Sequence, residues 1–110
     1  MLVNKATLVS QLTPPLDSQL AQQLVDEFVS QEKRFIQRDW EASQLDGGQF
    51  CEVMARIVYH KDSGNLNATK SVDECMGYVE NEQVTHLLQP RQTALHLAKV
   101  IRTVYKLLGW

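Results

Sequence analysis

The segment 90–110 constrains the fold more than any other part of the chain. At about 100° per residue, a helix through it gathers its large apolar side chains on one broad face. The segment contains four Lys or Arg residues and no Asp or Glu. These four cations, the basic stripe, fall within about 80° on another side of the helix. We predict one amphipathic helix that must bury its apolar face against the chain or a partner. The face comprises Thr93, Leu97, Val100, Ile101, Val104, Tyr105 and Leu108.

Charge is distributed unevenly along the chain. Residues 1–90 carry seven Lys/Arg against thirteen Asp/Glu, whereas residues 91–110 are purely basic. The last helix therefore has no carboxylate of its own for i,i+4 pairing. One interpretation is a face that binds phosphate or an acidic protein. The other is an ordinary solvated helix face. The candidate nucleic-acid contacts are Arg91, Lys99, Arg102 and Lys106.

Helical periodicity recurs along the whole sequence, and no segment alternates as a strand does. We predict an all-α bundle of about five or six helices that forms a single domain over residues 1–110. The first two helices have clear boundary signals. Asn4 caps the first, Pro14-Pro15 ends it, Asp17 or Ser18 begins the second, and the second ends near Arg38.

The second half of the chain has further boundary signals. We expect a turn at 45–48, with Asp46 as the N-cap of the next helix, and an exposed polar loop at 62–67. Ser71 and Glu74 form a capping box that opens a helix to about Glu80. A short helical turn at 84–88 and Pro90 as the first helical residue then lead into the last helix. The predicted core contains Leu24, Phe28, Phe50, Met54, Ile57, Ile101, Val104 and Tyr105.

The residues with catalytic potential form no recognised metal pattern. His60, His86 and His96 match no zinc-ligand spacing with Cys51 or Cys75, so we expect no metal and no cofactor. Two buried free thiols are the favoured interpretation of the cysteines, and a Cys–His nucleophile pair is the alternative.

One polar row runs along the predicted third helix. Glu52, Arg56 and His60 are spaced four residues apart and stack on one face. An ordinary Glu–Arg ion pair is the favoured interpretation. The alternative is a cleft against the last helix, in which Arg56 holds a phosphate.

No apolar run approaches the roughly 20 residues of a membrane span, and the N-terminus does not resemble a signal peptide. We therefore expect a cytoplasmic protein.

Two segments together resemble small helical proteins of the HEPN superfamily, which occur in bacterial toxin and abortive-infection defence systems. They are Asp46-Gly-Gly-Gln-Phe-Cys-Glu52 with its continuation to His60, and residues 90–106. The resemblance implies a helical bundle, often dimeric. Its active members cut RNA without a metal through an Arg-x₄₋₆-His motif, in which arginine contacts phosphate and histidine assists proton transfer.

The resemblance places that motif just beyond a helix like the last one here, past residue 110. One formal match is Arg91 to His96, but these side chains point about 140° apart on a continuous helix. We therefore expect a truncated, non-catalytic form of such a protein, with Arg91 and His96 only as weak catalytic candidates.

Two functional hypotheses follow. The first is a HEPN-like module, related to defence ribonucleases, that acts through dimerisation and RNA contact. The second is a protein-interaction bundle, such as an antitoxin or adaptor, with no nucleic-acid role. Both predict self-association or a partner protein, because the wide apolar face of the last helix is hard to cover within so short a chain.

Overall fold

The computed structural model describes residues 4–13, 15–36 and 40–108. Within these ranges the chain forms only helices and loops. The predicted all-α class is therefore confirmed. The predicted end of the second helix at Arg38 lies outside the described residues. The helices are α1 (Lys5–Leu12), α2 (Ser18–Ile36), α3 (Trp40–Ser63), α4 (Val72–Glu80) and α5 (Arg91–Leu107).

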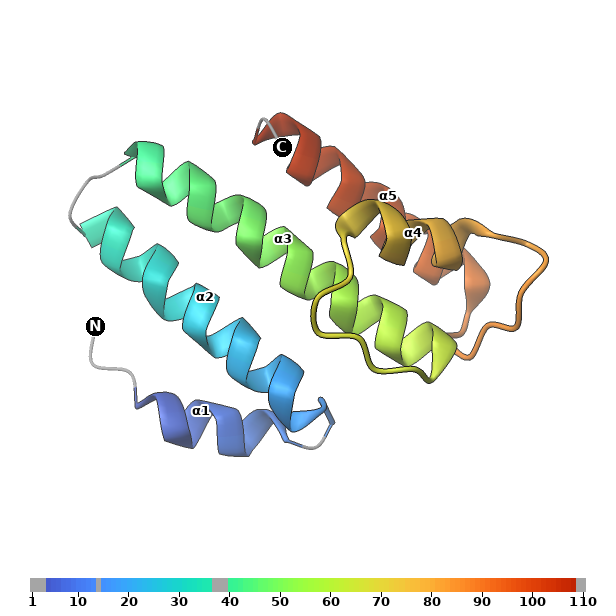
Figure 1. The fold of residues 1–110 in the computed structure, drawn as a ribbon, viewed down its shortest axis with the longest axis horizontal. Coiled ribbons are helices and arrows are strands. Elements are labelled where there is room, and N and C mark those ends of the chain that lie inside the picture. Colours follow the sequence, from blue (N-terminus) through green and yellow to red (C-terminus); the bar gives the residue numbers. More distant parts are fainter. Residues whose placement is uncertain (1–3, 14, 37–39, 109–110) are drawn as a thin grey trace.

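The long helix α3 is the centre of the arrangement (Figure 1). It lies antiparallel to α2 on one side and packs against α4 and α5 on the other, while α4 and α5 also contact each other. Among the described helices, α1 contacts only α2. The result is a flat bundle that measures 45 × 32 × 22 Å along its principal axes.

The first two helices begin at the predicted caps. The side chain of Asn4 accepts a hydrogen bond from the backbone N–H of Thr7 at 3.1 Å. Asp17 Oδ2 accepts from the N–H groups of Gln19 and Leu20, so Asp17 rather than Ser18 caps α2. Both carboxamide and carboxylate oxygens satisfy donors that a helix start leaves unpaired.

The predicted turn at 45–48 is wrong, because α3 continues through it, and position 46 lies within the helix rather than at its start. Two adjacent glycines each cost a helix about 1 kcal/mol relative to alanine, which is why the sequence favours a turn. The packing gives the glycines another role. Gly48 is buried, and a Cβ on Gly47 would lie 3.1 Å from Leu108 Cδ1. The glycines therefore let the end of α5 approach the α3 backbone.

The start of α4 matches half of the predicted capping box. Ser71 Oγ accepts the backbone N–H of Glu74 at 3.2 Å, as expected. The carboxylate of Glu74, however, accepts from the Ser71 hydroxyl at 3.0 Å. The helix ends at Glu80, where it was predicted to end.

Two predictions about the segment before α5 need correction. Residues 84–88 form no helical turn, because Leu87 and Leu88 donate their N–H groups to Asp62 of α3 instead. Pro90 is the N-cap of α5 rather than its first residue.

The predicted polar loop at 62–67 is exposed at Asn65 and Leu66 but not at its start. Asp62 lies in the last turn of α3 and is fully buried. The helix ends through Gly64, whose φ of 78° favours glycine and whose N–H donates to the His60 carbonyl at 2.9 Å.

The core consists of two clusters on opposite sides of α3. The smaller one joins α2 and α3 through Leu20, Val53 and Ile57. The larger cluster joins α3, α4 and α5 and contains Ala55, Val58, Tyr59, Val72, Cys75, Met76, Val79, Ala94, Ala98 and Ile101.

Most of the predicted core residues are at least partly buried. Ile57 and Ile101 are buried, and Leu24, Phe50, Met54 and Tyr105 are partly buried. Phe28 and Val104 were wrongly predicted, since they are 43% and 41% exposed.

Candidate functional site

The residues that α5 buries form a narrower strip than the predicted apolar face of this helix, and the strip lies toward one edge of that face. It consists of Ala94, Ala98 and Ile101, with Tyr105 partly buried beyond them. Two alanines allow the α5 backbone to lie close to α3 and α4, so the small residues face the core and most large ones do not. Of the predicted apolar face, Thr93, Leu97, Val100 and Val104 are exposed, and only Val104 among them was placed in the core by the sequence.

These large residues form an exposed row that we call the α5 ridge. It comprises Leu97 (40% exposed), Val100 (58%), Val104 (41%) and Leu107 (79%). Their spacings of three, four and three residues are those of the a and d positions in a coiled-coil seam. The ridge therefore has the pattern of a helix surface that packs against another helix.

The α5 ridge carries no charge and is bordered by uncharged residues of its own helix. On the helical wheel, the buried strip lies on one side, and Thr103 and His96 lie on the other. Lys99 and Lys106 lie at least about 80° away from every ridge residue. Two identical ridges brought together would therefore not place lysines against each other.

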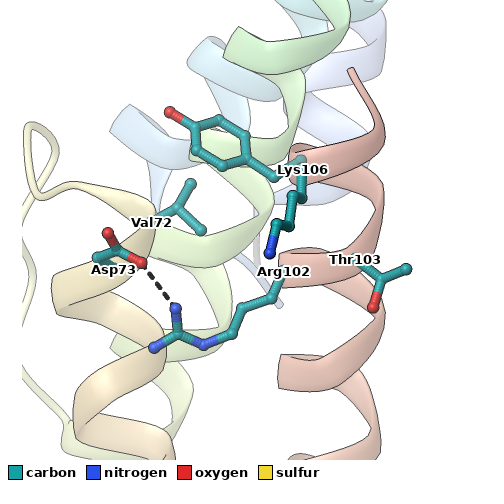
Figure 2. A pocket seen from close by; sticks show the side chains of 6 residues that line it. Val72, Asp73, Arg102, Thr103 and Lys106 are labelled. Atoms are coloured by element: carbon teal, nitrogen blue, oxygen red, sulfur yellow. Dashed lines mark hydrogen bonds and ion pairs between the residues drawn. The ribbon is translucent and has the colours of Figure 1, made fainter. Parts of the chain in front are cut away.

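The basic stripe on the other side of α5 is largely neutralised from within the molecule. Arg102 Nε–H donates to both carboxylate oxygens of Glu80 at 3.0 and 3.1 Å. Its Nη1–H donates to Asp73 at 2.7 Å (Figure 2). The hydrogen bond with Glu80, followed by that with Asp73, raises the pKa of Arg102 against the opposing effect of burial. The sequence shows no carboxylate on this helix, but α4 supplies two.

Arg91 is held in a similar way. Its guanidinium donates to Asp62 Oδ1 at 3.1 Å and to the backbone carbonyl of Val79. Of the four predicted nucleic-acid contacts, Lys99 and Lys106 are the two exposed ones. Lys106 lines an open pocket of about 590 Å³ between α4 and α5. The pocket is also lined by Val72, Asp73, Arg102, Thr103 and Tyr105.

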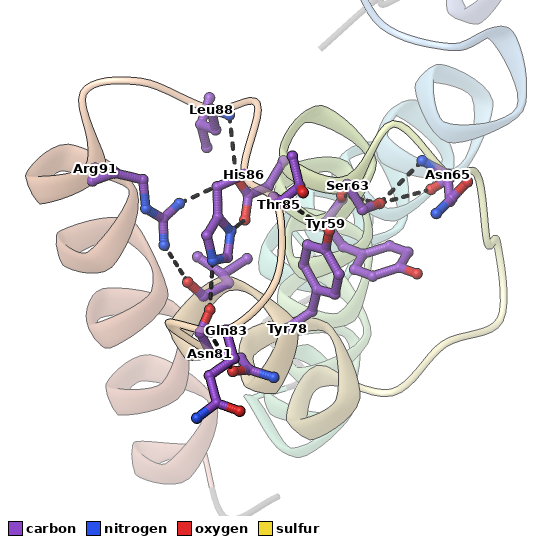
Figure 3. A network of polar contacts seen from close by, with 12 residues as sticks. Tyr59, Ser63, Asn65, Tyr78, Asn81, Gln83, Thr85, His86, Leu88 and Arg91 are labelled. Carbon is purple, nitrogen blue, oxygen red and sulfur yellow. Dashed lines mark hydrogen bonds and ion pairs between the residues drawn. The ribbon is translucent and has the colours of Figure 1, made fainter.

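A buried polar cluster centred on Asp62 joins the end of α3 to the segment before α5. Figure 3 shows His86, Leu88 and Arg91 of this network. Asp62 accepts from Leu88 and Arg91 through Oδ1, and Oδ2 lies 2.5 Å from His86 Nδ1. Sequence reasoning missed this cluster. One signal was present, because an aspartate in the last turn of a helix opposes the helix dipole and needs a partner.

The two residues of the weak catalytic pair have different surroundings. Arg91 is bound to Asp62, whereas His96 points into solvent from the exposed side of α5. The cysteines are poor nucleophiles. Burial raises the pKa of Cys75 to about 11, and burial, assisted by Glu52, raises the pKa of Cys51. In the described ranges, no three His, Cys, Asp or Glu side chains are arranged to hold a metal ion.

The Glu52–Arg56 ion pair is confirmed, with Arg56 Nη2 3.4 Å from Glu52 Oε2. Arg56 also donates to the Lys70 carbonyl at 2.9 Å, and Glu52 accepts from the Tyr105 hydroxyl at 3.2 Å. Arg56 thus ties α3 to the loop before α4 and is not directed at an open phosphate site.

No protein-family model matches the sequence, and no curated protein or solved structure matches it significantly. Within the residues that the structure describes, no helix combines the length and apolar character needed to cross a membrane.

Proposed function

We propose that this protein is a protein-interaction module whose partner is a second copy of itself, packed ridge to ridge along α5. The observation that carries the proposal is the α5 ridge, a row of four large apolar residues left exposed on a helix that packs into the core through Ala94, Ala98 and Ile101. Exposed apolar rows of this kind are typical of interaction surfaces.

A second copy suits the ridge for two reasons. In a twofold dimer the same patch meets itself, so the patch must be self-complementary. An uncharged seam meets this condition, since no like charges come together. The alternation of three- and four-residue steps also lets the side chains of one ridge enter the gaps of the other.

The RNA-contact hypothesis has weaker support. Arg91 and Arg102 already bind internal carboxylates, which leaves Lys99 and Lys106 as its main cations. Membership of the HEPN superfamily and a role in toxin–antitoxin defence rest on the sequence resemblance and remain hypotheses.

The proposal is tested by measuring the mass of the particle in solution by sedimentation at about 10–100 μM, a range suited to weak association. We expect the unmodified chain to be a dimer. Val100→Glu, which puts a charge in the middle of the ridge, should give a monomer of unchanged helix content. The matched control is Gln92→Glu, an equal change in charge at an exposed α5 position outside the ridge.

A monomeric unmodified chain throughout this range would refute the proposal, and so would a Val100→Glu variant that dimerises as strongly. RNA binding that weakens with salt, found in a chain that stays monomeric, would favour the RNA hypothesis instead.

A further inference from the structure

The imidazole of His86 lies between two hydrogen-bond acceptors. Its Nδ1 is 2.5 Å from Asp62 Oδ2, and its Nε2 is 2.5 Å from the backbone carbonyl oxygen of Asn81. A neutral imidazole has one N–H and one lone pair, whereas an imidazolium has two N–H groups. Neither acceptor has a hydrogen to give when Asp62 is ionised. Both contacts are therefore hydrogen bonds only when the His86 ring carries two protons.

The groups around the ring compensate such a charge. Asp62 from α3 is fully buried against it, and Arg91 from α5 shares that carboxylate. Glu80, at the end of α4, and Glu82 line the same open pocket as His86. The remaining titratable neighbour is Tyr78 of α4, whose ring meets the imidazole edge-to-face with centroids 5.5 Å apart. Asp62 is thus the carboxylate that touches the imidazole, whereas Glu80 is already bound to Arg102 of α5.

The two contacts connect three parts of the fold (Figure 3). Asp62 is in the last turn of α3, Asn81 is the C-cap of α4, and His86 is in the segment between α4 and α5. Asp62 also holds this segment through the N–H groups of Leu87 and Leu88, at 2.8 and 3.1 Å. His86 therefore fastens the middle of the segment to both helices.

Loss of one proton undoes one of the two contacts. The bond to the Asp62 carboxylate is charge-assisted and stronger than one to a neutral carbonyl, so the remaining proton stays on Nδ1. The Nε2 lone pair then faces the Asn81 carbonyl oxygen, and two acceptors repel each other. The connection to the end of α4 opens. The segment keeps its bonds to Asp62 but loses this support, so these bonds break more often and the Leu87 and Leu88 N–H groups exchange faster.

We propose that His86 is a proton-operated latch that closes the segment 81–90 against α3 and α4 when its ring is doubly protonated. The latch is independent of the α5 ridge and of self-association. Because the closed state holds a proton that the open state lacks, the segment is more stable at lower pH and loosens as pH rises. Histidine side chains ordinarily titrate between about pH 5 and 8, which is the range to examine.

The test combines ¹⁵N NMR of the imidazole with amide hydrogen exchange, both on the full chain between about pH 5 and 8. At the low end, both His86 nitrogens should have shifts of the protonated type. As the ring loses a proton, the protection of the Gln83, Leu87 and Leu88 amides, corrected for intrinsic exchange, should fall about tenfold, the equivalent of one hydrogen bond.

Two histidine variants sharpen the test. His86→Gln should have low protection at these amides at every pH. His96→Gln, which removes an exposed histidine of α5, should keep the pH dependence of the unmodified chain. Retention of that dependence in His86→Gln would overturn the proposal. If His86→Gln does not fold, the unmodified chain decides: a singly protonated ring while the three amides are fully protected would overturn it equally.

Discussion

The two sides of α5 differ in how the fold treats them. On the basic side, Arg91 and Arg102 reach across to carboxylates of α3 and α4. On the other side, the α5 ridge remains exposed. A buried or half-buried charge is costly without a partner, so folding provides one, whereas exposed apolar side chains carry a smaller penalty. The two arginines of the basic stripe thus have structural partners, and the apolar face for which the sequence required a partner is left partly open.

The largest effect should come from replacing Asp62, the buried carboxylate that binds Arg91 on the basic side of α5. Asp62→Ala removes the partner of His86 and Arg91 and leaves the Leu88 N–H unpaired. Breaking a buried ion pair in this way costs roughly 3–5 kcal/mol, which urea denaturation at neutral pH measures. Asp73→Ala, which removes an exposed carboxylate that also binds Arg102, is the control and should cost much less. A loss below about 1 kcal/mol for Asp62→Ala would mean that the cluster does not anchor α5.

A second experiment compares the buried strip with the ridge by adding volume to each. Ala98→Leu should cost about 1–3 kcal/mol, because Ala98 is fully buried where α5 meets α3 and α4. Val100→Leu enlarges an exposed residue two positions away and should change the stability by less than about 0.5 kcal/mol. Thermal or urea unfolding of the two variants checks the comparison. Equal losses would show that Val100 is packed, either within one chain or against a second copy.

The α4 contacts of Arg102 should make a smaller contribution. The side chain is partly exposed, so solvent screens its pairs with Glu80 and Asp73. We expect Arg102→Ala to cost about 0.2–1 kcal/mol. A double-mutant cycle with Glu80→Ala isolates the coupling between the two groups. A coupling of zero would mean that the Arg102–Glu80 pair adds nothing to the stability of the basic side.

The smallest effect concerns RNA. The chain should not cleave RNA, and any binding should depend mainly on Lys99 and Lys106. With two phosphate contacts, a plot of the logarithm of the binding constant against the logarithm of the salt concentration should have a slope no steeper than about −2. Replacing both lysines with Gln should remove this dependence in a filter-binding titration. A steep slope in the double variant, or RNA cleavage lost on His96→Ala, would restore the basic stripe as a functional site.

Local signals were sufficient for most helix boundaries. The caps at Asn4 and Asp17 and the Ser71–Glu74 pair each act through contacts within four residues, so a sequence pattern reveals them. The all-α class and the Glu52–Arg56 ion pair follow from equally local spacing. The contacts of the candidate site do not, because Asp62 meets Arg91 and Arg102 meets Asp73 across 29 positions.

The sequence by itself determined where helices begin and which residues share a helical face, because backbone capping and the helical repeat are short-range effects. Only the tertiary structure decided which face is buried. Ala98 is fully buried where α5 meets α3 and α4, and Gly47 lies close to Leu108, so small residues stand at these contacts while the α5 ridge is left outside. The burial of Asp62 likewise depends on contacts with segments far along the chain. Helices pack through the surfaces that fit closely, and charged side chains that this packing encloses are paired with opposite charges.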